Sequence, residues 1–129
     1  MSNLTYGSTS DAPPPAGAFS QSVRGGSVVW ASGQGGFNPH TGELVGDDVV
    51  SQTLQTLENV KAVLAASGAS LNEVVRVGVF ITTPDDFAAM NEAYQQFWDG
   101  EALPARTTVS VGLPAGMKVE IDAMAIVDG

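Results

Sequence analysis

Apolar residues recur along this chain at two spacings. Over residues 75–81 every second side chain is aliphatic, which predicts a strand with one buried face. Over residues 50–64 apolar side chains recur at every third or fourth position, which predicts an amphipathic helix. Asp47 and Asp48 precede this helix as N-caps, and the pair Ser67-Gly68 ends it.

A second helix and four further strands follow from shorter patterns. Thr83 is an N-cap with Pro84 at the first helical position, and apolar side chains then share one face until Gly100. The order ββαβαββ predicts an α+β domain of two layers, with both helices on one face of a mixed β-sheet. The four further strands are expected at residues 19–24, 27–31, 106–111 and 119–127.

Two segments fall outside this pattern. Residues 1–18 are rich in Ser, Thr, Gly and Pro and contain three consecutive prolines at 13–15, which predicts an extended N-terminal arm outside the core. Residues 32–46 consist of turn-forming residues and are long enough for a functional loop. The 129 residues are therefore expected to form a single domain.

Composition and charge exclude several classes of function. Five Lys and Arg residues against 14 Asp and Glu residues give a net charge of -9, so we expect no nucleic-acid partner and no anionic membrane surface. The absence of Cys excludes disulfides, thiolate metal sites and a Cys nucleophile. No segment resembles a signal peptide or is long enough to span a bilayer, so we expect a soluble cytoplasmic protein.

The last strand predicts an oligomer. Its alternating side chains form two rows, one on each face of the sheet. One row is apolar and can pack against the helices, whereas the other is half charged and half apolar. Because large exposed apolar patches are uncommon on monomers, we expect a second subunit to cover that face. The mixed row consists of Lys118, Glu120, Asp122, Met124 and Ile126.

Few residues offer recognisable site chemistry. His40 is the only histidine and has no partner His or Cys for a metal, so we interpret it as a solvated turn residue. The Gly-rich run 32–36 lacks the Gly-Lys-Ser/Thr of a phosphate-binding loop. Arg106 at a strand entry could clamp a carboxylate, and Glu120 among apolar neighbours could act as a general acid or base. A purely structural role, as an ion pair or a charge at the rim of the sheet, stays open for both.

Short motifs along most of the chain resemble the reactive intermediate deaminase family, also called YjgF-like proteins. The most specific is the run 104–108, Pro-Ala-Arg-Thr-Thr, followed near the C-terminus by Glu120-Ile121. The other motifs are Phe19-Ser20-Gln21, Ser32-Gly33-Gln34, Asn38-Pro39-His40-Thr41-Gly42, Gln52-Thr53, Glu58-Asn59-Val60, Asp86-Phe87 and Asn91-Glu92-Ala93-Tyr94.

The resemblance implies a chorismate-mutase-like fold and a homotrimer with active clefts between subunits. It implies hydrolysis of 2-enamine or 2-imino acids to 2-keto acids and ammonia without a cofactor or a metal. Arg106 would clamp the substrate carboxylate, and Glu120 would position or deprotonate water. The substrate-binding residues would be Phe19, Ser32, Gly33, Asn91 and Thr108.

The chain departs from the family pattern at three places. Family members usually have Tyr where this chain has Phe19, and many have Cys where it has Thr108. The pair Gly35-Gly36 is expected to open the pocket beside the Ser-Gly-Gln motif. Two alternatives therefore stay open: an enzyme acting on another small imine or carbonyl metabolite of a catabolic or biosynthetic pathway, and a non-catalytic trimeric module that binds small acids or acts like a chaperone.

Overall fold

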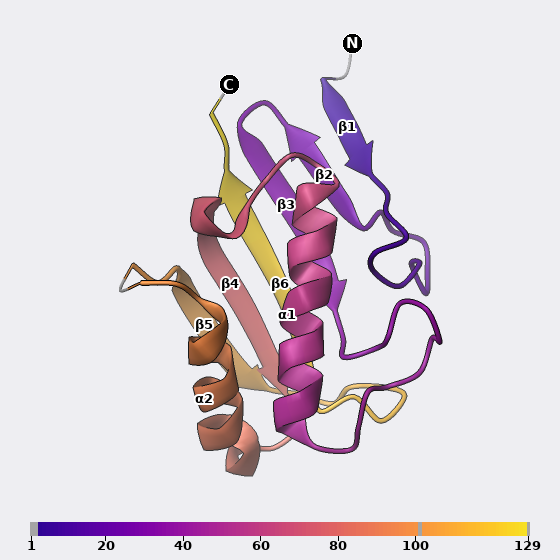
Figure 1. The fold of residues 1–129 in the computed structure, drawn as a ribbon, viewed down its shortest axis with the longest axis vertical. Helices are drawn as coiled ribbons and strands as arrows, with labels where there is room; N and C mark the ends of the chain where they lie inside the picture. Colours follow the sequence, from indigo (N-terminus) through magenta and orange to yellow (C-terminus); the bar gives the residue numbers. More distant parts are fainter. Residues whose placement is uncertain (1–2, 101, 129) are drawn as a thin grey trace.

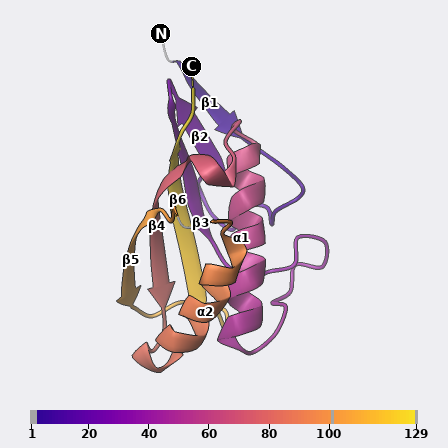
Figure 2. The same cartoon turned by 60° about the vertical axis from the view of Figure 1, so that its left-hand side comes forward.

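The computed structural model describes residues 3–100 and 102–128. In this part of the chain six strands form one sheet, and two α-helices lie against one of its faces (Figures 1 and 2). The fold is therefore the expected two-layer α+β domain. The helices are α1 (Val49–Ala65) and α2 (Phe87–Phe97), and the strands are β1 (Leu4–Gly7), β2 (Ser22–Gly25), β3 (Val28–Gln34), β4 (Val74–Ile81), β5 (Ala105–Ser110) and β6 (Val119–Ile126).

The sheet is mixed, with strand order β1-β2-β3-β6-β4-β5. Neighbouring strands are antiparallel except β4 and β5, which run parallel. A parallel pair needs a crossover connection, and α2 lies within it. Short 3₁₀ helices precede β4 (Leu71–Glu73) and α2 (Pro84–Asp86). This topology leaves β5, which carries Arg106, at the edge of the sheet.

The core lies between the helices and the sheet. Leu57 and Leu64 of α1 and Met90 of α2 are buried together with Ile121 of β6. The predicted N-cap is present, because the Asp48 carboxylate accepts a hydrogen bond from the Ser51 backbone N–H at 2.8 Å. No helix in the described part of the chain is both long and apolar enough to cross a membrane.

Two strands differ from the sequence-based expectation. The alternation in β4 holds from Val77 to Ile81, but Val75 is 41% exposed while Val74 is buried. A register shift between β4 and β6 near Val74 explains this reversal, because one displaced residue moves a side chain to the other face. The β2–β3 hairpin turns at residues 26 and 27, where Gly26 has a φ of 59°, and β3 continues to Gln34 inside the expected loop.

The arm is not wholly outside the sheet. Residues 4–7 form β1 and pair antiparallel with β2, so the element order gains one strand at its start. The sequence pattern did not predict this strand because its apolar side chains are not alternately buried: Leu4 is 48% and Tyr6 is 64% exposed. β1 joins the edge of the sheet through backbone pairing.

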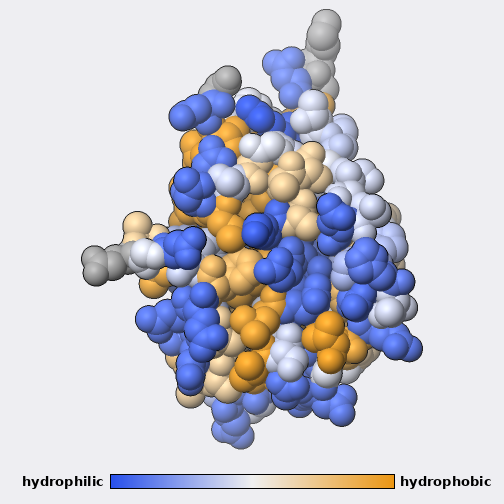
Figure 3. All heavy atoms as spheres, viewed as in Figure 1, coloured by the Kyte–Doolittle hydropathy of each residue, from blue (hydrophilic) through white to orange (hydrophobic). Residues whose placement is uncertain are grey.

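The face of the sheet away from the helices carries exposed apolar side chains. Trp30 and Ile126 are 49% and 44% exposed, and Val28 and Met124 lie in register with them on the same face. On the helix side, hydrophilic side chains cover most of the rim and apolar ones gather along the middle (Figure 3). Because Met124 and Ile126 lie on the uncovered face, the mixed row expected for β6 faces away from the helices.

Candidate active site

The two residues expected to carry the chemistry lie on opposite faces of the sheet. Arg106 of β5 is in register with Val77 of β4, whereas Glu120 of β6 is in register with Phe80 of β4. Residues three positions apart on a strand point to opposite sides. The Arg106 guanidinium carbon lies 4.7 Å from the ring centroid of Tyr94 on α2, which places it on the helix side. One chain therefore does not bring Arg106 and Glu120 together.

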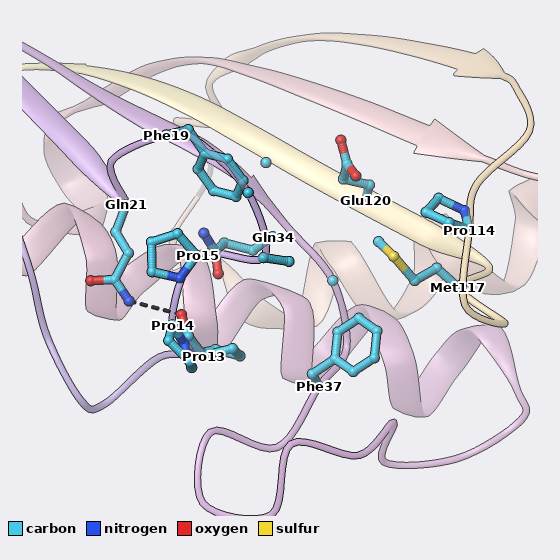
Figure 4. A pocket seen from close by; sticks show the side chains of 14 residues that line it. Pro13, Pro14, Pro15, Phe19, Gln21, Gln34, Phe37, Pro114, Met117 and Glu120 are labelled. Carbon is cyan, nitrogen blue, oxygen red and sulfur yellow. Dashed lines mark hydrogen bonds between the residues drawn. The ribbon is translucent and has the colours of Figure 1, made fainter.

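Glu120 borders a pocket of about 300 Å³. Three loop regions contribute to it: the arm at residues 13–17, the end of β3 with the loop after it, and the β5–β6 loop. Phe19, Phe37 and Met117 surround the same hollow as Glu120 (Figure 4). The pocket thus combines one carboxylate with a largely apolar lining.

Gly33 allows the Glu120 carboxylate to lie against the backbone of β3. A Cβ atom at Gly33 would lie 2.6 Å from Oε2 of Glu120 and 2.9 Å from its carboxyl carbon. These distances are shorter than real Cβ contacts allow. The absence of a side chain at Gly33 therefore helps to set the position of Glu120.

Glu120 titrates at a higher pH than an ordinary glutamate. Burial raises the pKa of Glu120, and the negative charge of Asp122 on the same strand raises that pKa further. Asp122 itself accepts a hydrogen bond from the Gly78 backbone N–H at 3.0 Å and lies 3.4 Å from a guanidinium nitrogen of Arg76. A raised pKa suits a carboxyl group that both takes and returns a proton near neutral pH.

Arg106 borders a second hollow, which Asn91, Tyr94 and Pro104 also line. In the part of the chain that the structure describes, Arg106 forms no ion pair, so its fork of N–H donors is open to an anion. Burial raises the pKa of Tyr94 to about 12, and the Arg106 charge acts in the opposite direction. Tyr94 therefore remains an uncharged ring beneath the guanidinium.

Thr108 shares the face of Arg106, since it pairs with the buried Val79. Its Oγ1 is buried and has no hydrogen-bond partner among the described residues. Ser32 differs, because its hydroxyl donates to the Ser20 carbonyl at 2.6 Å and so fastens the segment before β2 to β3. Ser32 therefore supports the pocket and does not line it.

The expected site residues thus fall into two groups. Phe19, Gly33 and Glu120 border the first pocket, and Asn91 and Arg106 border the second. Of the two extra glycines only Gly35 lines the first pocket, so the expectation that Gly36 opens it is wrong. A Cβ at Gly36 would instead meet the backbone of Gln52 on α1 at 2.8 Å.

Sequence reasoning missed other parts of the first pocket, namely Phe37, Met117 and the proline wall of the arm. They come from three separate segments of the chain, with Met117 80 positions after Phe37, and no local pattern connects them. His40 is exposed in its turn, as expected. The described residues contain no group of three or more His, Cys, Asp or Glu side chains that could hold a metal ion.

Comparisons with known proteins show sequence similarity over nearly the whole chain. The family model described as endoribonuclease L-PSP matches residues 9–127. A RutC family protein of Pyrococcus horikoshii is 45% identical over 118 residues, which are 91% of this chain and 93% of that protein. A 2-iminobutanoate/2-iminopropanoate deaminase of Dermatophagoides farinae is 40% identical over 122 residues, 94% of each chain.

A solved structure shares the fold. The crystal structure of Escherichia coli TdcF with bound serine matches with a TM-score of 0.91 at 41% identity, over 96% of this chain and 99% of that one. The structural likeness therefore extends over nearly the whole chain.

Proposed function

Because the chain belongs to the reactive intermediate deaminase family, whose family model is described as endoribonuclease L-PSP, we propose that it hydrolyses 2-imino acids to 2-keto acids and ammonia. Water adds through its oxygen to the carbon of the C=N bond, and the resulting carbinolamine expels its nitrogen as ammonia while the C=O bond forms. Atoms balance with one water consumed. No oxidant, reductant or cofactor takes part.

Arg106, which has no ion-pair partner among the described residues, and Glu120 at its pocket carry this proposal, and the sheet between them requires two copies of the chain. A 2-imino acid has its carboxylate directly bonded to the reacting carbon, so the clamp and the base must both lie within a few ångströms of one small molecule. A single chain holds the two side chains on opposite faces. The active cleft is therefore formed where Arg106 of one copy meets the Glu120 pocket of another.

The exposed apolar face supports such an assembly. Trp30, Met124 and Ile126 lie on the side of the sheet that the helices do not cover. Burying this face between copies removes apolar surface from water and brings edges carrying Arg106 close to neighbouring subunits. In keeping with the family resemblance, we propose a homotrimer, in which three equivalent interfaces each form one cleft.

Arg106 suits the role of carboxylate clamp. Its guanidinium stacks on the Tyr94 ring at 4.7 Å and lacks an acidic partner among the described residues. A planar fork that is already oriented can donate two parallel hydrogen bonds to a carboxylate. Asn91 on the same hollow and the unpartnered hydroxyl of Thr108 on the same face supply further polar groups for the substrate.

Glu120 suits the role of general base and acid. As a carboxylate it takes a proton from the attacking water, and it then returns that proton to the departing nitrogen. The raised pKa of Glu120 favours the second of these steps more than an ordinary glutamate would. Positioning and proton transfer carry the rate, because an imine is already an electrophile in water.

The deaminase reaction fits this chain better than cleavage of RNA. The net charge of -9 repels a phosphate backbone, and Arg106 is the one basic residue among the described residues that line its hollow. A site that binds and cleaves RNA would need several basic side chains along the path of the RNA backbone.

The test is keto-acid release from freshly generated 2-aminoacrylate. We expect the protein to accelerate pyruvate and ammonia formation over the uncatalysed rate, and the Arg106→Ala variant to lose this acceleration. Binding of pyruvate without any acceleration would contradict the proposal and support a small-acid-binding module instead.

A further inference from the structure

The end of the Glu120 pocket away from the carboxylate is apolar. We propose that this end, formed by Phe37, Met117 and the proline wall at residues 13–15, binds the substrate's side chain and selects imino acids whose side chains are apolar and of about leucine size. The inference rests on the proposed deaminase function and names its substrate class.

The size of the pocket supports a substrate larger than a three-carbon acid. Its volume of about 300 Å³ lies at the lower end of the range for pockets that enclose drug-sized ligands. A 2-imino acid derived from alanine would leave much of that space to water. A branched side chain of four carbons would occupy more of that space and bury apolar surface against the lining.

Both glutamines of the lining already make hydrogen bonds within the chain. Gln34 donates to the Ser32 carbonyl at 3.3 Å, and Gln21 donates to the carbonyls of the arm. Glu120 is the only charged residue among those that line the pocket. A charged side chain of a substrate would therefore lose more hydration than the apolar lining returns, and an acidic one would also meet the charge of Glu120.

Gly35 determines how closely the apolar floor packs. A Cβ atom at Gly35 would lie 2.6 Å from the terminal methyl of Met117 and 3.0 Å from the Phe37 ring. Glycine at this position lets both side chains lie against the loop backbone and leaves the pocket open. Because the Met117 methyl is the end of a flexible side chain, an alanine at Gly35 would displace it and change the pocket with little effect on the fold.

Gln21 holds the proline wall in place. Its side chain is only 3% exposed and makes three hydrogen bonds to the backbone of the arm. Oε1 accepts from the Thr9 N–H at 2.7 Å, and Nε2 donates to the Thr9 carbonyl at 3.1 Å. Nε2 also donates to the Pro13 carbonyl at 2.8 Å (Figure 4). Gln21 is therefore a positioning residue for one wall of the side-chain subsite.

The experiment compares kcat/KM for imines generated in situ from alanine, leucine and glutamate. We expect the leucine-derived imine to exceed the glutamate-derived one by at least about tenfold, the lower end of what a misfit in an apolar pocket produces. Gly35→Ala should lower the leucine-to-alanine ratio by about tenfold. The control is Gly112→Ala, because a Cβ at Gly112 meets nothing within 4 Å.

Equal rates for the leucine and glutamate imines, or a ratio that Gly35→Ala leaves unchanged, would overturn the subsite. Calorimetry with pyruvate, 4-methyl-2-oxopentanoate and 2-oxoglutarate makes the same comparison without turnover. If no imine is hydrolysed, the deaminase proposal fails, and the keto-acid affinities still decide the subsite: preference for 4-methyl-2-oxopentanoate supports it and equal affinities contradict it.

Discussion

Arg106 and Glu120 are carried by strands on either side of β4, yet their side chains lie on opposite faces of the sheet. Arg106 rests on the Tyr94 ring of α2, and Glu120 borders a pocket on the uncovered side. A reaction that uses both groups on one small molecule requires two copies of the chain.

Replacing Arg106 by Lys should weaken binding of a 2-keto acid although it keeps the positive charge. Lysine has no planar fork, so it loses one of two parallel hydrogen bonds and the stacking on Tyr94, at a cost of about 1.5 to 3 kcal/mol. Calorimetry with pyruvate measures this. The control is Arg24→Lys, since the Arg24 side chain donates to the Gly26 carbonyl at the β2–β3 turn and lines neither of the two pockets. Unchanged affinity in Arg106→Lys would remove Arg106 from the site.

Replacing Gly33 by Ala should reduce turnover with little loss of stability. The new methyl would collide with the Glu120 carboxylate, which can rotate away because it is the end of a flexible side chain. We expect kcat to fall by about tenfold or more, with the free energy of unfolding changed by less than about 1 kcal/mol. Steady-state kinetics and urea unfolding check the two parts, and a full kcat would show that Glu120 acts from another position.

Replacing Gly36 by Ala should instead reduce the stability of the fold. A Cβ there would meet the backbone of Gln52, which cannot move without shifting α1, and the buried Gln52 side chain also donates to the Gly46 carbonyl and accepts from the Lys118 N–H. We expect a loss of stability of about 1 to 3 kcal/mol. Thermal unfolding of the Gly36→Ala variant, compared with the Gly112→Ala control, measures this loss. Equal stabilities of the two variants would contradict the close packing of Gly36 against Gln52.

Replacing Asp122 by Asn should move the acidic limb of the pH–rate profile to lower pH. Glu120 must be ionised to act as a base, so activity falls as pH decreases through its pKa. Burial is the larger cause of the raised pKa of Glu120, and the charge of Asp122 is the second. Removing that charge lowers the pKa of Glu120, and the freed Arg76 acts in the same direction.

The Asn side chain retains an oxygen that can accept from the Gly78 N–H. The strand pairing is therefore kept in this variant. If the acidic limb of the pH–rate profile of Asp122→Asn stays in place or moves to higher pH, Glu120 is not the titrating base.

The sequence predicted the strands and helices that bury one face and expose the other. β4, β6 and α1 bury one face each, so their apolar residues repeat at the period of the element. β1 has no such signal, because backbone pairing with β2 holds it while Tyr6 stays exposed. The shift at Val74 and Val75 was equally unpredictable, since it depends on the partner strand.

The candidate site was predictable in its residues and not in its arrangement. The motifs singled out Arg106 and Glu120, but their faces depend on the register with β4, which no single segment determines. The apolar end of the pocket brings Phe37 next to Met117 through tertiary packing alone. Its only local signal was the glycine at position 35.

The most direct test of the shared cleft is complementation between two inactive variants. Arg106→Ala and Glu120→Gln each remove one half of every cleft, so each should have less than about 1% of wild-type activity alone. If the chains are unfolded together and refolded as a mixture, an interface can combine an intact Arg106 from one chain with an intact Glu120 from the other. Random assembly of equal amounts then predicts about one quarter of wild-type activity. A mixture that forms mixed oligomers and stays as inactive as its parents would contradict a site built from two copies.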